Sequence, residues 1–250
     1  MDTAIIEPSK GGGLVIYNDV TLSKLALAST MYDCLTPFNK SLALLNGDTG
    51  GSIDLSNHAH RTSLLIWLND WGCRHLSEEH HKVASDSILK WYQAKGDDLF
   101  PENKPLWDLG DAELKMAASA YGSLKDKIGA WRDRGGRKVK VHIGPTAASK
   151  ILFAIRPQAL MPWDEAIRAS YKFDGSAESY YRYLEEMRNF TLHIEDICKN
   201  KGLQIDGLPK ELGRPGSTVL TLVNKYIWIT RTKKCILPSA KTLARWAELG

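Results

Sequence analysis

Residues 144–168 read GPTAASKILFAIRPQALMPWDEAIR and contain the starts of two helices. Pro145 suits the first turn of a helix, because the N–H that it lacks would have no partner there. The apolar residues that follow recur at helical spacing until Pro157 ends the helix. Asp164 precedes EAIR and suits an N-cap, because its carboxylate accepts backbone N–H groups. The stretch therefore predicts two helices joined by a proline-bounded turn, with Asp164 twenty positions after Gly144.

Most of the remaining chain also has its apolar residues at helical spacing, without an internal repeat or a strand-helix alternation. We therefore expect a mainly α-helical fold. The expected further helices cover about 21–45 (divided near Pro37), 59–71, 78–94, 111–132, 176–199, 216–230 and 239–248.

The rest of the chain is expected to connect these helices. Residues 1–13 are predicted to be a flexible leader and 14–20 a short strand or extended segment, while NGDTGGS (46–52) predicts a loop. RDRGGRKVKVHI (132–143) is interpreted as a basic connector with two glycines. Residues 14–250 would then form a single helical domain made of two packed lobes, about 55–135 and 136–250.

The positive charge is concentrated in two segments of the chain. Residues 125–150 contain eight Lys or Arg and two Asp, and residues 225–245 contain six Lys or Arg and no acid. Because the net charge of the whole chain is +4, the residues outside these segments carry a net charge of −8. This asymmetry favours one positive surface that binds a polyanion, although solvated loops and helix faces would give the same pattern.

The sequence argues against several other classes of protein. It has no apolar run long enough to span a membrane and no secretory signal, so we expect a cytoplasmic protein. Cys34, Cys73, Cys198 and Cys235 lie far apart and predict reduced, mostly buried thiols rather than a zinc ribbon or an iron–sulfur cluster. The His and Cys residues at 58–81 fit no standard zinc spacing, so we expect no metal and no cofactor.

The motif Gly144-x-x-Ala147-Ala148, followed by an apolar helix and then by Pro162-Trp163-Asp164-x-x-Ile167-Arg168, resembles the helix-hairpin-helix superfamily of DNA glycosylases. The close resemblance covers about residues 135–170. In that family a short helix follows the hairpin glycine, and the catalytic aspartate stands twenty residues after this glycine at the start of the next helix. The resemblance implies a compact multi-helix glycosylase-like fold in which Asp164 is the catalytic residue.

The physical chemistry of these residues agrees with a DNA partner. The turn at His142-Ile143-Gly144 leads into a helix N-terminus, whose N–H groups can hold a phosphate. The neighbouring basic residues would add salt-dependent affinity. The residues expected to bind DNA are His142, Gly144, Thr146, Lys150, Arg137, Lys138 and Lys140.

Asp164 would face the deoxyribose of a nucleotide that is turned out of the duplex. Cleavage of an N-glycosidic bond develops positive charge on the sugar, which a carboxylate stabilises. Aromatic residues commonly clamp a flipped base, and the candidates are Trp163, Trp67, Trp71 and Trp91, which are equally suited to the core. Asn69 and Arg74 could read the base and its phosphate, or could cap a helix end and pair with Glu78 or Glu79.

The chain departs from the family pattern in ways that narrow the expected chemistry. Family members that also cut the strand have a lysine two residues after the hairpin glycine, whereas this chain has Thr146, so we predict base removal without strand cleavage. Lys150, one helical turn further on, is a possible substitute amine. His142 replaces the first hairpin glycine and Lys140-Val141 replaces Leu-Pro. The family's four-cysteine cluster is absent from the sequence.

The sequence thus predicts a monofunctional DNA N-glycosylase of a bacterial or phage-related kind, acting as a monomer on damaged bases or on modified bases of phage DNA, in single or double strands. The alternative is a helix-hairpin-helix protein that binds DNA without catalysis and uses Asp164 only as a cap. A third possibility is a helical protein that binds another protein and has no affinity for DNA.

Overall fold

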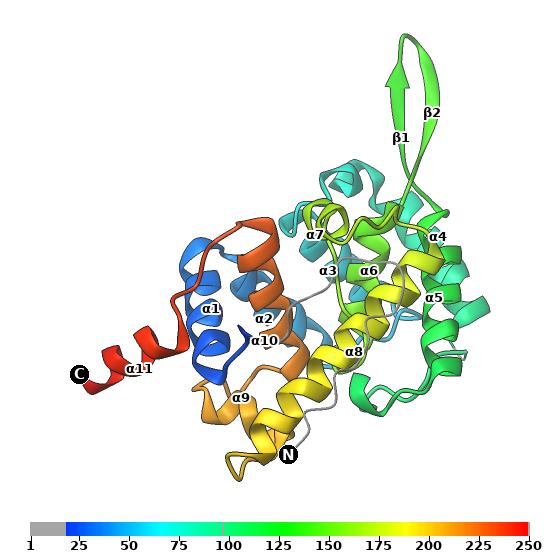
Figure 1. Cartoon of the computed structure of the whole chain (residues 1–250). Helices are drawn as coiled ribbons and strands as arrows, with labels where there is room; N and C mark the ends of the chain where they lie inside the picture. Colours follow the sequence, from blue (N-terminus) through cyan, green and yellow to red (C-terminus); the bar gives the residue numbers. More distant parts are fainter. Residues whose placement is uncertain (1–18, 97, 250) are drawn as a thin grey trace.

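The computed structural model describes residues 19–96 and 98–249, and this part of the chain is mainly helical (Figure 1). The mainly α-helical class is confirmed, while a glycosylase-like arrangement stays a prediction. The predicted leader at 1–13 and the predicted extended segment, except for its last two residues, lie outside the described residues. The elements in chain order are α1 (Leu22–Leu35), α2 (Phe38–Thr49), α3 (His58–Asp70), α4 (His81–Lys95), α5 (Asp111–Lys125), β1 (Ile128–Arg134), β2 (Arg137–His142), α6 (Gly144–Ile155), α7 (Glu165–Ser170), α8 (Ala177–Lys199), α9 (Leu208–Glu211), α10 (Val219–Ile227) and α11 (Ala240–Glu248).

Helix α6 lies in the interior of the protein, where α3 and α5 pack against it. Most of its residues are apolar, and its polar residues Ser149 and Lys150 are buried as well. An apolar helix of this kind is stable only when other elements cover it on most sides. One continuous cluster of buried side chains includes α6 and extends from Val20 to Ile227, so the first and last described helices of the body share a core.

The segment 132–143, interpreted as a connector, is instead most of an antiparallel β-ribbon that projects from the helical body (Figure 1). The predicted helix at 111–132 ends at Lys125, and β1 follows it. Gly135 and Gly136 form the turn with φ of +60° and +80°. A two-residue turn with positive φ at both positions matches the twist of a hairpin, and glycine adopts it without strain.

The ribbon leaves and re-enters the body at one point. The N–H of Ile143 donates to the carbonyl of Lys127 at 2.8 Å, which joins the end of α5 to the start of α6. These two helices therefore meet as they would across a short hairpin, and the ribbon is an excursion between them.

Two other expectations need correction. The predicted loop at 46–52 begins too early, because α2 continues to Thr49 and ends at Gly50 in the left-handed conformation. The helix predicted at 216–230 starts at Val219, and a π-helical turn, Trp228–Thr232, follows α10. Helix α1 packs on α10, and α2 packs on α3.

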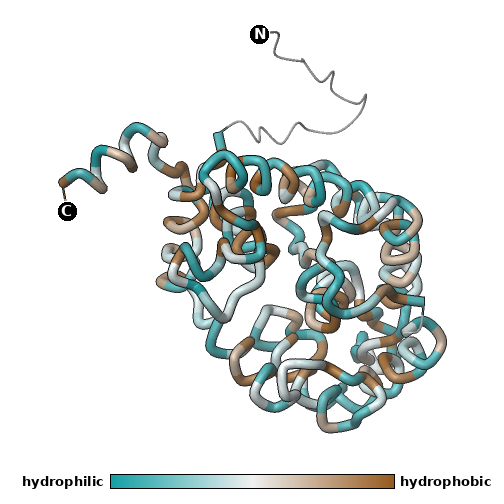
Figure 2. Tube along the Cα trace, turned by 90° about the horizontal axis from the view of Figure 1, so that it is seen from below, coloured by the Kyte–Doolittle hydropathy of each residue, from teal (hydrophilic) through white to brown (hydrophobic). Residues whose placement is uncertain are grey.

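Helix α11 stands off from the body in both views (Figures 1 and 2), and none of its residues is buried. Within the described residues, no helix is long and apolar enough to cross a membrane.

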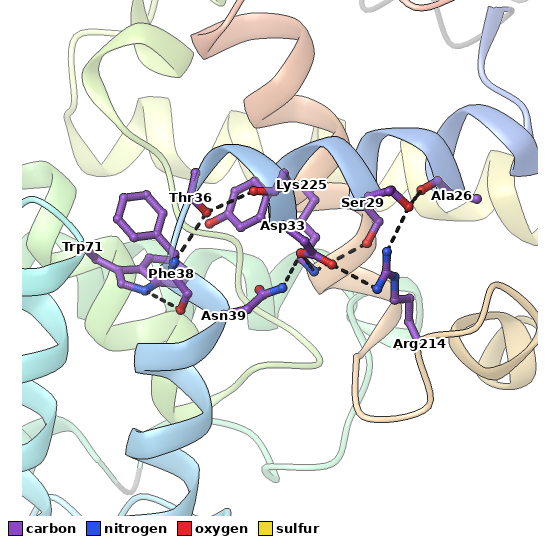
Figure 3. A network of polar contacts seen from close by, with 11 residues as sticks. Ala26, Ser29, Asp33, Thr36, Phe38, Asn39, Trp71, Arg214 and Lys225 are labelled. Atoms are coloured by element: carbon purple, nitrogen blue, oxygen red, sulfur yellow. Dashed lines mark hydrogen bonds and ion pairs between the residues drawn. The ribbon is translucent and has the colours of Figure 1, made fainter.

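A carboxylate ties the N-terminal helices to α10 (Figure 3). Asp33 of α1 accepts from Lys225 of α10 at 2.8 Å and pairs with Arg214 at 3.0 Å. The side-chain amide of Asn39, in α2, donates to the same carboxylate. Lys225 is only 3% exposed, so its ammonium group depends on Asp33 for a counter-charge.

Replacing Asp33 by Ala should lower the free energy of unfolding by about 3 kcal/mol, because Lys225 would remain buried without its partner. Urea unfolding measures this loss. Asp98→Ala is the matched control: its carboxylate pairs with Lys95 at the surface, and its removal should cost less than about 1 kcal/mol. Equal losses in the two variants would contradict the role given to Asp33.

Candidate active site and DNA-binding surface

The backbone before Asp164 is held against α6 by a buried serine. The hydroxyl of Ser149 accepts the N–H of Trp163 at 3.2 Å and lies 3.3 Å from the carbonyl oxygen of the same residue. The indole N–H of Trp163 donates to the carbonyl of Pro145 at 3.3 Å. The segment that carries Asp164 is therefore aligned with the first turns of α6.

Two tyrosines of α8 hold the same segment from its other side. The hydroxyl of Tyr180 donates to the carbonyl of Met161 at 3.0 Å, and that of Tyr183 to the carbonyl of Pro162 at 3.2 Å. Both side chains are fully buried, and their rings pack on the ring of Trp163. Buried carbonyl groups need such partners, so α8 and α6 together fix the chain entering Asp164.

Asp164 is the N-cap of α7 and is partly exposed. Its Oδ1 accepts the N–H of Ile167 at 2.7 Å, and its Oδ2 accepts the hydroxyl of Thr232 at 2.8 Å. Each oxygen has one donor and keeps a second lone pair. The carboxylate is therefore held in one orientation and can still accept another donor.

Asp164 lines a small cavity, which we call the Asp164 cavity. Its volume is about 30 Å³, which suffices for a water molecule but not for a nucleobase. Aromatic rings from distant parts of the chain form much of its wall, and Trp71 and Trp163 are the two that the sequence predicted. The lining residues are Tyr32, Phe38, Trp71, Lys150, Pro162, Trp163, Asp164, Ile167, Asn224 and Trp228.

The sequence predicts that Lys150 binds DNA, which requires an exposed side chain. In the structure it is buried and lines the Asp164 cavity. Its ammonium group donates to the carbonyl of Trp71 and lies 5.6 Å from the centre of the Trp71 ring. Burial lowers the pKa of Lys150, and the nearby Cys73 and Asp164 oppose part of this shift. The amine and the Asp164 carboxylate thus line the same cavity.

A larger depression lies in front of the N-terminus of α6, and we call it the α6 hollow. Its volume is about 370 Å³. Gly144 has a φ of +78°, a conformation that turns the chain from the ribbon into the helix and that glycine adopts without strain. Free N–H groups at a helix N-terminus attract anions. The residues around the hollow are Gly72, Cys73, His75, Arg132, Val141, His142, Ile143, Gly144, Pro145 and Thr146.

Thr146, at the position where strand-cutting family members have lysine, is partly buried and accepts a hydrogen bond from Arg168 at 2.9 Å. The guanidinium of Arg168 also lies 5.7 Å from the centre of the Trp163 ring. The hydroxyl of Thr146 therefore binds α7, the helix that Asp164 caps, and Thr146 also lines the α6 hollow.

The structure brings together some of the predicted site residues and separates others. His142, Gly144 and Thr146 meet at the α6 hollow, and Arg137, Lys138 and Lys140 are exposed on the ribbon. Asn69 and Arg74 do not line the Asp164 cavity, and Arg74 lines a depression beside the ribbon. Trp67 is 1% exposed and packs on Trp71, and Trp91 donates to the carbonyl of Ala120 in the core.

Sequence reasoning missed five residues at the Asp164 cavity or on its carboxylate, one of which is Asn224 of α10. Tyr32 and Phe38 come from the N-terminal helices, and Trp228 and Thr232 from the π-helical turn. No local pattern marks them, because only the tertiary fold brings them to Asp164. The turn itself is a signal in the structure, since short π-helical turns are frequent at functional sites.

The cysteines and histidines give no metal centre in the described residues, where no group of three potential ligands gathers. The four cysteines are free thiols; Cys73 and Cys198 are buried, Cys235 is partly buried and Cys34 is exposed. The prediction of mostly buried thiols therefore does not hold for Cys34.

Comparison of the chain with protein-family models, with curated proteins and with solved structures found no match.

Replacing Ser149 by Ala should lower the free energy of unfolding by about 2 kcal/mol, because the buried N–H of Trp163 would lose its acceptor. Chemical denaturation measures the loss. In the control Ser170→Ala, an exposed hydroxyl that bonds only within its own helix is removed, and stability should change by less than about 0.5 kcal/mol. A neutral Ser149→Ala would show that this hydroxyl does not hold the segment.

The stability difference between the wild type and Lys150→Met should depend on pH. Burial lowers the pKa of Lys150 in the folded protein, so the unfolded chain binds this proton more tightly. The wild type should therefore gain stability relative to the variant as the pH rises from the lowered pKa toward about 10.4, the ordinary lysine value. Urea unfolding of both proteins between about pH 7 and 10 measures the trend. A difference that stays constant or changes in the opposite direction contradicts the lowered pKa.

Proposed function

We propose that the protein is a monofunctional DNA N-glycosylase that turns a damaged or modified base out of the strand and hydrolyses its N-glycosidic bond, leaving an abasic site. It would act as a cytoplasmic, nucleoid-associated monomer. The observation that carries the proposal is the position of Asp164. Its carboxylate has a fixed orientation and lines a cavity with aromatic walls. The neighbouring helix α6 begins directly after the basic ribbon of β1 and β2.

The chemistry follows from the orientation of the carboxylate. The N–H of Ile167 and the hydroxyl of Thr232 hold Asp164, so it need not reorganise as positive charge develops on the sugar. A fixed negative group at that point stabilises the transition state. The cavity has room for a water molecule beside the carboxylate, and that water would attack the sugar.

The strand would be held by the α6 hollow. A phosphate there would accept N–H groups at the start of α6, with Gly144 allowing close approach. Cationic side chains of the ribbon would neutralise neighbouring phosphates. Thr146 offers a hydroxyl rather than an amine, so no Schiff base would form at this position and the strand would remain uncut.

The base pocket must open before a flipped base can enter, because the Asp164 cavity is smaller than a nucleobase. Phe38 and Trp228 stand in its wall, with ring centres 6.5 Å apart. Trp228 begins the π-helical turn that also supplies Thr232. A shift of this turn would widen the pocket and leave aromatic faces on which a base could stack.

One observation favours the second candidate, a DNA-binding protein without catalysis. Both oxygens of Asp164 already have a protein donor, one of them from the helix that it caps. In this case the carboxylate would be structural, and DNA would bind at the α6 hollow without loss of a base.

Asp164→Asn should reduce the rate of base release by roughly 100- to 1000-fold, because the amide lacks the negative charge that stabilises the sugar cation. Asparagine also caps helices, so the variant should fold and bind DNA. The assay measures the free base released from modified oligonucleotides by mass spectrometry, and the product strand should break only after alkali treatment.

The matched control is Asp174→Asn. Asp174 is an exposed carboxylate that accepts the N–H of Ser176 and the hydroxyl of Ser179 near the start of α8, away from the Asp164 cavity. Its replacement should leave base release unchanged. If Asp164→Asn releases the base as fast as the wild type while it still binds DNA, the protein is not a glycosylase that uses Asp164.

A further inference from the structure

The two faces of the β-ribbon differ in their charged side chains. Residues paired across an antiparallel ladder lie on the same face, and neighbours along a strand lie on opposite faces. The register pairs Arg134 with Arg137 and Arg132 with Val139. Three arginines therefore share one face with no acidic residue, and we call it the arginine face.

The opposite face carries a weaker charge. There Lys138 is paired with Asp133, and Lys140 with Trp131. The carboxylate of Asp133 also accepts the N–H of Gly136 at the turn. With two lysines and one aspartate, this face has a net charge of +1, against +3 on the arginine face.

The arginine face leads directly to the α6 hollow. Val141 is paired with Ala130 and so lies on the same face as Arg132. Arg132 and Val141 both line the hollow, together with Gly144 and Thr146. A strand whose phosphate occupies the hollow would therefore continue along the arginines rather than along the lysines.

The arginines are available to a partner. Arg132 is exposed, as are Arg134 and Arg137 at the tip. Within residues 19–96 and 98–249 no acidic side chain forms an ion pair with any of the three. An unpaired arginine cluster on a projecting ribbon matches a polyanion, because guanidinium groups bind phosphates and base edges with two hydrogen bonds.

The dimensions of the ribbon fit the major groove of DNA and not the minor groove. The major groove of B-DNA is about 12 Å wide and admits a two-stranded ribbon, whereas the minor groove is about 6 Å wide. From Ile128 to Arg134 the ribbon extends about 20 Å at about 3.3 Å per residue, a length of about six base pairs at roughly 3.4 Å each.

We propose that the arginine face enters the major groove of duplex DNA and reaches about six base pairs to one side of the nucleotide held at the α6 hollow. This inference rests on the proposed function, because it takes the α6 hollow as the point where the DNA strand is held. According to this proposal, the ribbon causes the protein to prefer duplex DNA over single-stranded DNA.

The test compares two variants that each remove three positive charges. R132Q/R134Q/R137Q removes the arginine face, and K199Q/K201Q/K210Q removes three exposed lysines near the end of α8 and in α9, far from the ribbon (Figure 1). Fluorescence anisotropy measures the affinity of each for a 30-base-pair DNA duplex at several salt concentrations. A third variant, K138Q/K140Q, tests the other face of the ribbon.

The arginine variant should bind the duplex about 100-fold more weakly, and the slope of log affinity against log salt should fall by up to about three. The distant lysine variant should bind like the wild type, and K138Q/K140Q should lose less than the arginine variant. Equal losses in the arginine and distant variants would overturn the proposal, as would an arginine variant that binds normally or a wild type that does not bind the duplex.

Dimethyl sulfate distinguishes the grooves, because it methylates guanine N7, which lies in the major groove. The wild type should protect guanines within about six base pairs on one side of the modified base, and the arginine variant should not. Unprotected N7 in the wild-type complex would overturn the proposal. So would an equal loss of affinity for an RNA duplex, whose deep and narrow major groove excludes side chains.

Base release from single-stranded oligonucleotides, measured on the same proteins, separates this proposal from the glycosylase. If duplex binding depends on the arginines and no protein releases a base, the ribbon proposal stands and the proposed enzymatic activity fails. If release depends on Asp164 and the arginine variant binds the duplex normally, the activity stands and the ribbon proposal fails.

Discussion

The geometry of the candidate site depends on the hydrogen bonds between Ser149 and the backbone of Trp163. These bonds join the interior helix α6 to the segment that ends at Asp164. Because α6 starts at the α6 hollow and its second turn carries Lys150 to the Asp164 cavity, the same helix positions the lining of the hollow, the buried amine and the carboxylate. The tyrosines of α8 complete this arrangement by bonding the carbonyls just before Trp163.

Local chemistry explains why the sequence predicts this part of the fold well. Pro145 lies in the first turn of α6, and Asp164 caps α7 through the N–H of Ile167. Both are interactions within a few residues, so short-range reasoning finds them. The ribbon could also have been recognised, because KVKVH alternates and Gly135-Gly136 is a hairpin turn. The high density of basic residues in this segment is equally typical of a solvated connector.

The walls of the Asp164 cavity could not be predicted in the same way. Tyr32 and Trp228 are far apart in the sequence, yet their ring centres lie 5.0 Å apart beside Asp164. Such contacts depend on how α1 packs on α10, which the network around Asp33 stabilises (Figure 3). Trp67 illustrates the opposite case, since this candidate for the base pocket is a core residue that does not line the cavity.

The two proposed parts of the DNA-binding surface have different roles, catalysis at the Asp164 cavity and duplex binding at the ribbon. The Asp164 cavity would act on one nucleotide, and the ribbon would hold the duplex beside it. The central claim is tested most directly by incubating the wild-type protein with a panel of DNAs that carry damaged and hypermodified bases, followed by mass spectrometry of the small molecules set free. The account predicts a free base and an uncut strand with one abasic site. Stable binding to the same DNAs without release of any base would contradict it.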